Sequence, residues 1–571
     1  MAPWRRLRRS PRERLRPPTY QVGLCPRDVL HRAMGKKKRQ HLEVSRVELA
    51  AIVERTRDGA LGAEDFAKLK AAIDTLAFLQ AELQAKGTSI ARLRQLLFGA
   101  PTEKTRAVLK QAGNKPPGGP EAGQQEKARR PGHGRTGAAA YTGAARQKVA
   151  HATLQGGEAC QGCLKGKVYP LQEPAVLVRV TGMAPLAATV WECERLRCNL
   201  CGEVYTAAPP QGVGPEKYDA SASAMVGLLK YGTGLPFHRI EKLQEGLGVP
   251  LPASTQWELV KEAAQKLQPV FEELITEAAQ AEVLHNDDTT MKVLDLSKEQ
   301  MAAAAAGAEQ ERTGVYTSGL IATKGERAIA LFFTGQKHAG ENLAEVLKRR
   351  AAQLKAPVQM SDALAANTSG DFKSILANCL SHARRGFVDV VNDFPEECRF
   401  VLETLREVYL TDAAAKEQRL SPAERLGLHQ RESGPRMKQL EGWLEEQFTE
   451  HKVEPNSGLG AAIKYMRKHW QKLTLFLREP GAPLDNNVCE RALKKAILHR
   501  KNSLFYRSEN GARVGDTFMS LIHTVELCDG NPFDYLVALL RHQERVADEP
   551  DRWMPWNNRQ ALDELRTTTT P

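Results

Sequence analysis

Three groups of acidic residues lie far apart in the sequence and have the chemistry of divalent-metal ligands. Asp287 and Asp288 end an apolar run, Asp362 follows a second one, and Glu490 lies just beyond Leu484-Asp485-Asn486-Asn487. Carboxylates can hold two Mg²⁺ ions about 3.5–4 Å apart, an arrangement that supports in-line attack on a phosphodiester. We therefore predict that the chain cuts and joins DNA, against the alternative of three ordinary surface carboxylates.

The elements predicted around the first two groups place them on one sheet. The pattern indicates strands over 282–287, 313–323 and 328–333, a helix over 341–354, a strand over 357–361, a strand over 376–382 and a helix over 384–391. This order is typical of an RNase H-like sheet. In such a sheet the first and fourth strands are neighbours, so Asp287 and Asp362 would lie close together.

The third acidic group is predicted to start a helix, with Asn486 or Asn487 as its cap and Glu490 in its first turns. Residues 396–478 are helical in pattern and would be an insertion into the core. Three carboxylates within about 4 Å repel by roughly 4 kcal/mol per pair at an effective dielectric constant near 20. Such a cluster therefore needs cations.

Two cysteine pairs predict a second metal site. Cys160-Gln-Gly-Cys163 and Cys198-Asn-Leu-Cys201 flank segments that read as strands over 175–180 and 187–193. Four thiolates satisfy tetrahedral Zn²⁺, and a site closed by protein ligands organises folding without catalysing. We predict a structural zinc ribbon over 151–208; the alternative is four unrelated thiols, and Cys193 is an extra thiol nearby.

The N-terminal part has a different composition. Residues 1–48 form a basic tail with too few apolar residues to fold; alternatively, translation starts at Met34 and the Arg-rich stretch before it is an artefact of gene calling. Residues 49–110 have a helical stripe from Leu69 to Leu97, and residues 111–150 form a basic linker rich in glycine and proline. The stripe predicts a coiled coil and hence a homo-oligomer, or else a helix that packs on its own domain. Residues 209–280 are helical and form either a DNA-binding helix-turn-helix or a plain connector.

Composition fits a partner of opposite charge. The 571 residues carry a net charge of +13 with a pI near 9.2, which suits a polyanion such as DNA. A chain this long exceeds a single core of about 250–300 residues, so several domains are expected. No run of about 18 apolar residues exists to span a membrane, and the N-terminus lacks a secretory signal. We expect a cytoplasmic protein, associated with the nucleoid when bound to DNA.

The sequence resembles the transposases of insertion sequence 66 from about Leu69 to Leu540. The matching motifs are Leu284-His285-Asn286-Asp287-Asp288-Thr289, Cys379-Leu380-Ser381-His382-Ala383-Arg384-Arg385-Gly386-Phe387, and Leu484-Asp485-Asn486-Asn487 through Glu490-Arg491-Ala492-Leu493 with Arg500-Lys501-Asn502. The chain departs from the family pattern at Asp288-Thr289-Thr290, at Ala363-Leu364 and at Leu380. The resemblance implies a multidomain α/β protein with an RNase H-like core over 281–395 and 479–545, a helical insertion over 396–478 and a tail over 546–571.

The resemblance also implies a DDE transposase. Asp287, Asp362 and Glu490 would be its catalytic residues and hold two Mg²⁺ ions, for which Mn²⁺ can substitute. The enzyme would cleave the ends of an insertion element and transfer the 3′-OH strands into target DNA, with small accessory proteins as further partners. The predicted DNA contacts are His382, Arg384, Arg385, Arg491, Lys494, Arg500 and Lys501. Two alternatives stay open: an inactive DNA-binding protein, and an RNase H-like nuclease that does not join strands.

Overall fold

The computed structural model describes residues 216–568 except 299–313, 369 and 371, together with short pieces between 153 and 214 and single positions before them. The basic tail over 1–48 lies outside the described residues. The helical stripe over 49–110 and the linker over 111–150 are described only at isolated positions. The coiled coil and the linker therefore stay predictions.

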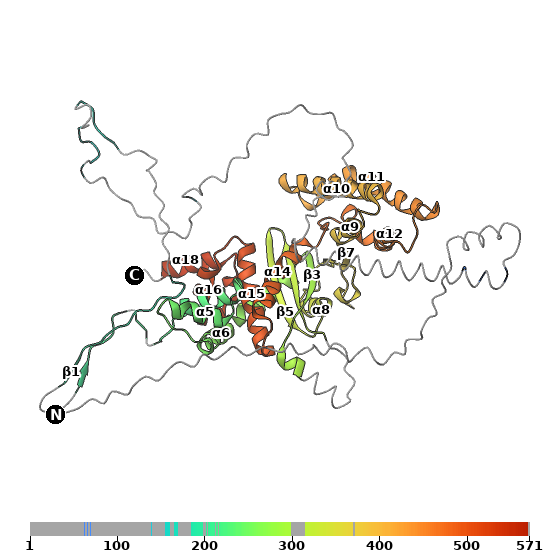
Figure 1. The fold of residues 1–571 in the computed structure, drawn as a ribbon. Helices are drawn as coiled ribbons and strands as arrows, with labels where there is room; N and C mark the ends of the chain where they lie inside the picture. The colour runs from blue at the N-terminus through green and yellow to red at the C-terminus, as the bar shows by residue number, and fades with distance from the viewer. Residues whose placement is uncertain are drawn as a thin grey trace, which may run out of the picture. The chain divides into compact units, whose positions relative to one another are not determined.

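A five-stranded mixed sheet lies at the centre of the described chain (Figure 1). Its strands are β3 (Val283–Thr290), β4 (Tyr316–Lys324), β5 (Arg327–Gly335), β6 (Val358–Ser361) and β7 (Ile375–Asn378), in the order β5-β4-β3-β6-β7. Strands β5, β4 and β3 are antiparallel, while β3, β6 and β7 are parallel. The strands predicted over 313–323 and 328–333 are β4 and β5, which pair as a hairpin, and the strand predicted over 357–361 is β6.

The predicted strand over 376–382 is wrong in its second half. Strand β7 ends at Asn378, and helix α9 (Leu380–Asp389) begins two residues later. The buried positions Leu380, Ala383, Arg384 and Phe387 recur at helical spacing, so burial of this stripe favours a helix there. His382 therefore lies in the first turn of a helix and not on a strand.

Helices cover the sheet and extend beyond both its edges (Figure 1). On the side of β3 to β5 they are α4 (Ala220–Gly227), the π-helix η2 (Leu228–Gly232), α5 (Phe237–Gly246), α6 (Ala253–Ala279), α8 (Ala339–Leu347), α14 (Asn487–Ser503), α15 (Glu509–Leu527), α16 (Pro532–Arg541), α17 (Gln543–Asp548), η5 (Pro550–Trp553) and α18 (Asn558–Thr568). On the side of β6 and β7 they are η3 (Ala365–Asn367), α9, α10 (Pro395–Glu417), α11 (Pro422–Thr449), α12 (Gly458–Lys468), α13 (Trp470–Leu473) and η4 (Leu475–Leu477). None of the described helices is long and apolar enough to cross a membrane.

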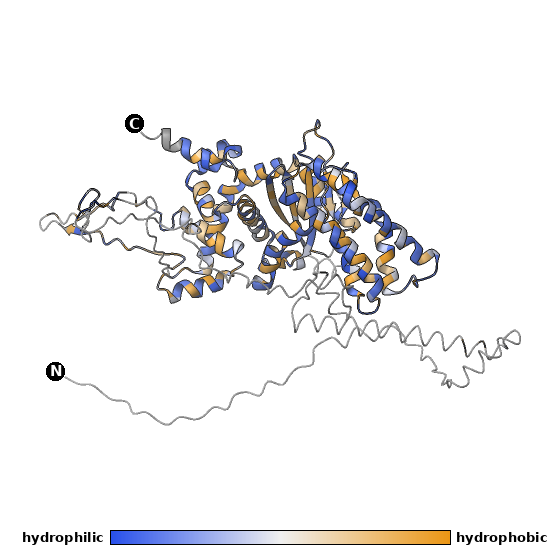
Figure 2. Ribbon diagram, turned by 90° about the horizontal axis from the view of Figure 1, so that it is seen from above, coloured by the Kyte–Doolittle hydropathy of each residue, from blue (hydrophilic) through white to orange (hydrophobic). Residues whose placement is uncertain are grey.

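Two hydrophobic cores hold this arrangement together. The first joins β3, β4 and β5 to α4, α6, α14, α15 and α16, so the helices of 209–280 share the core of the sheet instead of forming one of their own. The second joins β6, β7 and α9 to α10–α12, and these last three helices lie in the stretch predicted to be helical over 396–478. Figure 2 shows the outer helices striped in hydrophilic and hydrophobic colours, as amphipathic helices should be. The predicted tail over 546–571 contains helices, and Trp553 and Met554 are buried in the first core.

Helix α15 closes the edge of the sheet at β5. The backbone N–H groups of Ala330, Phe332 and Thr334 donate to side chains of Thr524, Ser520 and Asp516 at 3.1, 2.9 and 2.7 Å. Two residues of a strand and four residues of a helix both span roughly 6–7 Å. One polar side chain per helical turn therefore accepts from each of these three N–H groups. The helix thus satisfies an edge that would otherwise be open to pairing with another strand.

Asp516 makes this contact sensitive to pH. Burial raises its pKa to about 8, against the opposing effect of the hydrogen bonds from Thr334. The unfolded protein releases this proton at a pKa of about 4, whereas the folded protein keeps it up to a pKa of about 8. The stabilisation is therefore complete below about pH 4 and is lost as the pH rises from about 4 through about 8. Between pH 5 and 8.5 we expect the unfolding free energy of the wild type to fall by up to about 4 kcal/mol relative to Asp516→Asn. Urea unfolding at several pH values measures this difference.

Ser520→Ala is the matched control, because it removes a hydrogen bond from the same edge without removing a titratable group. It should lower the unfolding free energy by about 1 kcal/mol, and this loss should be the same at every pH. Parallel pH profiles for wild type and Asp516→Asn would contradict the prediction.

The cysteine region is described only in part. Strands β1 (Arg195–Arg197) and β2 (Val204–Thr206) pair antiparallel and enclose Cys198 and Cys201, while the antiparallel bridge Ala159–Lys167 encloses Cys160 and Cys163. Cys201 is exposed, and the other three cysteines lie outside the described residues. The predicted strand over 187–193 is wrong, because this stretch has no regular structure and the strand begins at Arg195.

Candidate active site

Two of the three predicted carboxylates meet at the centre of the sheet. In the parallel pairing of β3 and β6, His285 lies opposite Met360, and the same register continued by two residues places Asp287 beside Asp362. Asn367 of η3 lies between them: its Nδ2 donates to Asp362 Oδ1 at 2.6 Å and to Asp287 Oδ1 at 3.5 Å. One amide group therefore bridges both carboxylates.

Asp288 points to the opposite face of β3 and has other partners. Its carboxylate accepts hydrogen bonds from Ser318 Oγ at 2.7 Å and from the Ala339 backbone N–H at 3.0 Å, and it lies 2.9 Å from His338 Nδ1. These contacts hold the start of α8 against the sheet, where a helix N-terminus favours negative charge. The alternation along the strand thus gives the two neighbouring aspartates different surroundings.

Helix α14 brings Glu490 to the same face as Asp287. Gly319 of β4 pairs with Asp287, and a Cβ atom at Gly319 would lie 2.9 Å from the side chain of Leu493. A larger residue there would push the helix away from the sheet, so the glycine permits the close approach that places Glu490 over β3 and β4.

Asn486 occupies the N-cap position of α14, one of the two positions predicted, but its side chain makes no capping bond. It accepts from His285 Nδ1 at 3.1 Å and donates to the Asn286 carbonyl oxygen at 3.1 Å. Asp485 Oδ1 accepts from the Asn487 N–H, at 3.1 Å. Because both polar atoms of the Asn486 side chain bond to β3, this residue fixes the start of α14 against the sheet.

The electrostatics of the site reflect this crowding. Burial raises the pKa of Asp287 to about 7, and the negative charges of Asp362, Glu490 and Asp288 add to the shift. The Asp288 backbone N–H, which donates to Asp287 Oδ1 at 2.8 Å, opposes this shift. Glu490 Oε1 is buried and has no hydrogen-bond partner among the described residues. The site therefore has more carboxylate oxygens than hydrogen-bond donors, and oxygen ligands are those that Mg²⁺ prefers.

Asn367 is a site residue that the sequence did not reveal. Its backbone carbonyl accepts from the buried side chains of Asn286 and Gln359, both at 2.7 Å, and Gln359 also donates to Asn286 Oδ1 at 3.1 Å. This network fixes the short helix that presents the Asn367 amide to the carboxylates. The sequence offers only the amide side chains of Asn286, Gln359 and Asn367, and these have no fixed spacing that would predict their contact.

We expect Asn367→Ala to lower the unfolding free energy of the metal-free protein by about 1.5–3 kcal/mol, because a hydrogen bond to a charged group is lost. Added Mg²⁺ should restore more stability to the variant than to the wild type, since bound cations neutralise the carboxylates directly. Thermal unfolding in EDTA and in Mg²⁺ measures both effects.

Asn378→Ala is the control, because Asn378 donates to the backbone carbonyl oxygen of Asp362 at 3.2 Å and not to its carboxylate. Its response to Mg²⁺ should equal that of the wild type. An equal response of Asn367→Ala would rule out the bridging role.

The residues predicted to contact DNA differ in their exposure and in their partners. Arg491, Lys494 and Lys501 are exposed on α14, beyond Glu490. Arg500 is tied to the end of β3 through Thr289 Oγ1 and Thr290 Oγ1, at 3.1 and 2.6 Å. Arg384 is buried and donates to Thr105 Oγ1 at 3.3 Å, so we leave it out of the proposed contacts.

An open cavity of about 610 Å³ adjoins the carboxylates. It lies between α9 and α12, and Asp362, His382, Arg385, Tyr465 and His469 are among its lining residues. Three of these had been predicted as site residues. The lining is largely apolar, and beside Asp362 it presents Arg385, Asp389 and the rings of His382, Tyr465 and His469.

Comparison with known proteins shows the family of the chain. The family model described as Transposase IS66 family matches residues 216–514, just over half of the chain. The uncharacterized protein y4jD of Sinorhizobium fredii is 26% identical over 380 residues, which cover 64% of this chain and 71% of that protein. The uncharacterized protein y4hP of the same organism is 26% identical over 391 residues, covering 64% of this chain and 67% of that protein. The chain therefore belongs to the IS66 family of transposases.

Proposed function

We propose that the chain is a DDE transposase that cleaves the ends of an insertion element and transfers the 3′-OH strands into target DNA. Asp287, Asp362 and Glu490 are its catalytic carboxylates. The observation that carries the proposal is the bridged pair Asp287 and Asp362, with the pKa of Asp287 raised to about 7 by burial and by the charges of Asp362 and Glu490. Family membership and the antiparallel-then-parallel strand order, which is that of an RNase H-like core, support it.

The same three residues would hold the metal ions. Their oxygens fit Mg²⁺ because they form a hard, acidic donor set with an unpartnered Glu490 Oε1. When bound, two such ions supply a lowered pKa for the attacking water and charge stabilisation for the departing 3′ oxygen. The protein itself contributes positioning: the β3–β6 register sets two carboxylates, the docked start of α14 sets the third, and the Asn367 amide limits their repulsion before metal binds.

The exposed cations of α14 complete the proposal on the DNA side. Arg491, Lys494 and Lys501 lie on the helix that carries Glu490, so phosphates held there would lie beside the carboxylates. His382 and Arg385 line the adjoining cavity and would contact the strand that enters it.

A structural Zn²⁺ on Cys160, Cys163, Cys198 and Cys201 belongs to the same proposal. Each cysteine pair is enclosed by an antiparallel pairing, which is the way a two-knuckle ribbon presents its ligands. Self-association through the helical stripe over 69–97 would hold two DNA ends together.

Strand transfer tests the proposal directly. The protein is incubated with Mg²⁺, a supercoiled plasmid and labelled duplexes that carry the terminal sequences flanking its gene, supplied with free 3′-OH ends. Joined products are expected. Cleavage of uncut ends without joining would favour a nuclease, and DNA binding without either reaction would favour an inactive binding protein.

A further inference from the structure

We propose that Cys379, His382 and Glu490 form a binding site for a thiophilic divalent cation, with Zn²⁺ as its probe. The three residues lie beside the carboxylate cluster, and Glu490 is common to both. The site would therefore act as an inhibitory site that competes with Mg²⁺ for one ligand, a consequence that rests on the proposed function.

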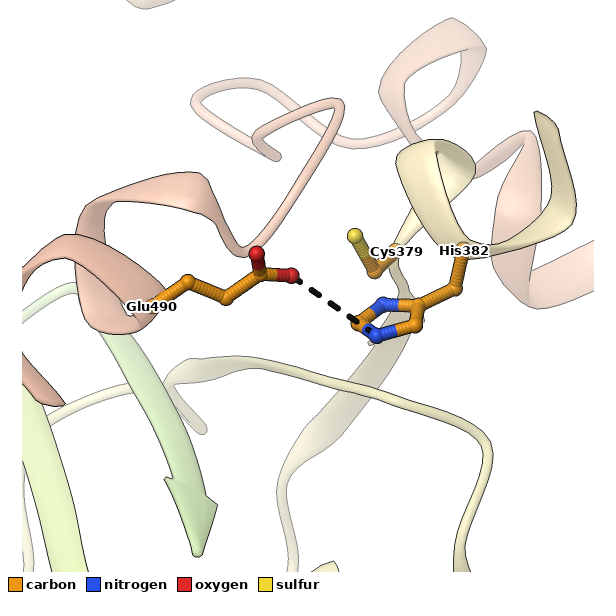
Figure 3. A group of neighbouring side chains, drawn as sticks. All are labelled: Cys379, His382 and Glu490. Carbon is orange, nitrogen blue, oxygen red and sulfur yellow. Dashed lines mark ion pairs between the residues drawn. The ribbon is translucent and has the colours of Figure 1, made fainter. Parts of the chain in front are cut away.

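The three side chains come from two helix starts that are joined by hydrogen bonds. Cys379 directly precedes α9, His382 lies in its first turn, and Glu490 lies in the first turn of α14 (Figure 3). The Leu380 N–H donates to the Leu484 carbonyl oxygen at 3.0 Å, and the Asn486 N–H donates to Cys379 Sγ at 3.2 Å. The cluster is thus fixed by backbone contacts and needs no further folding to form.

The distances suit a tetrahedral ion. Ligand bonds of about 2.0–2.3 Å place the ligand atoms of a zinc site roughly 3.3–3.8 Å apart. Glu490 Oε1 and His382 Nε2 are 3.7 Å apart, too long for a hydrogen bond. One ligand atom from each of the three residues lies within 4.8 Å of the others, so the sulfur needs to move by about 1 Å at most.

Two buried polar atoms of the cluster have no hydrogen-bond partner within the part of the chain that the structure describes. Both His382 Nδ1 and Glu490 Oε1 are buried without a hydrogen bond. Unpaired buried polar atoms cost stability, and coordination of a cation removes that cost for the atom that becomes a ligand. In Figure 3 the Glu490 and His382 side chains point toward each other, with the Cys379 sulfur alongside.

The ligand set also decides which ion binds. A thiolate and an imidazole select Zn²⁺, Co²⁺ or Cd²⁺ over Mg²⁺, which prefers oxygen ligands. Zinc binding releases the Cys379 proton to solvent and forms a metal–sulfur bond, so no oxidant or reductant is needed. An ion held there would keep the Glu490 carboxylate on the side of α9, where it already faces His382, and away from metal ions held by Asp287 and Asp362.

Metal binding to the full-length protein tests the site without any DNA. We compare the number of Zn²⁺ ions bound per chain in the wild type, Cys379→Ser and His382→Ala after equilibration in excess Mg²⁺. Zn²⁺ bound by other cysteines is the same in all three proteins, so it does not affect the difference. We expect the wild type to bind one more Zn²⁺ per chain than either variant. With Co²⁺, the wild type should have additional thiolate-to-cobalt charge-transfer absorption that Cys379→Ser lacks.

Cys398→Ser is the matched control, because Cys398 is equally buried but lies on α10 outside the cluster. It should bind as much Zn²⁺ as the wild type. Circular dichroism checks that Cys379→Ser is folded, and His382→Ala gives a second variant at a half-exposed position. Equal stoichiometry and equal cobalt spectra in wild type and both folded variants would overturn the inference.

Strand cleavage separates this site from the proposed function. If the chain cleaves DNA, Zn²⁺ should inhibit the wild type at concentrations about 10–100-fold lower than those that inhibit Cys379→Ser. If the chain does not cleave DNA, the difference in bound Zn²⁺ still supports the metal site, and only the inhibitory consequence is lost.

Discussion

Asp287→Asn is expected to reduce the rate of Mg²⁺-dependent DNA strand cleavage by about 10³-fold or more, while DNA binding is retained. The substitution keeps the shape of the side chain but removes a negative charge from the residue whose pKa the charges of Asp362 and Glu490 raise. An amide oxygen is a weaker ligand for Mg²⁺ than a carboxylate, so the ions would bind poorly. Removal of a negative charge should not weaken the attraction of a phosphate backbone. Gel-based cleavage and mobility-shift assays on one duplex measure the two properties.

Asp288→Asn is the matched control, one residue away on the other face of β3. Its carboxylate contacts Ser318, His338 and the start of α8, away from the proposed catalytic face. We expect a loss of stability of about 1–3 kcal/mol with cleavage retained in the folded protein. If Asp288→Asn abolished cleavage and Asp287→Asn did not, the assignment of the two residues would be reversed.

The contrast between these neighbours explains how much of the site was predictable. Side chains alternate along a strand, so Asp287 and Asp288 point to opposite faces of β3, and the family resemblance selects Asp287 as the catalytic one. The hairpin and the strand before Asp362 followed from apolar alternation and a glycine turn, and together they predicted which carboxylates would be neighbours. These features depend on local patterns, which a sequence carries directly.

Other features depend on contacts between distant segments, and the sequence did not predict them. Asn367 became a site residue because a short helix after β6 is held by Asn286 and Gln359. Arg384 was predicted to contact phosphate, but the helical register that begins at Leu380 turns it inward. Cys379 looked like one residue of a family motif, and its proximity to Glu490 follows only from the pairing of two helix starts. Each case needed the tertiary arrangement, since local spacing does not encode it.

The buried side chain of Asn486 is expected to support both the fold and Glu490, so Asn486→Leu should lower the unfolding free energy by about 3–5 kcal/mol. The Asn286 carbonyl can only accept, so Asn486 Nδ2 must face it, and Oδ1 must then accept from His285 Nδ1. Burial lowers the pKa of His285 to about 4, so its ring is neutral at about pH 7. In the variant its Nδ1–H group has no acceptor in place of Asn486 Oδ1. Leucine fills a similar volume but leaves both groups buried without a partner.

The same substitution should also reduce cleavage in the folded fraction, because Asn486 lies one turn before Glu490 and sets where α14 meets β3. Asn487→Ala is the control: its side chain bonds to Asp485 Oδ2 at 2.8 Å and to Ser381 Oγ at 3.4 Å, in a half-buried position. We expect that control to cost about 1 kcal/mol and to leave cleavage within a few-fold of the wild type. Urea unfolding and cleavage rates at matched folded protein concentration distinguish the two. Equal stability losses for Asn486→Leu and Asn487→Ala would mean that the motif acts only as a helix start, and that the bonds from Asn486 to β3 do not position Glu490.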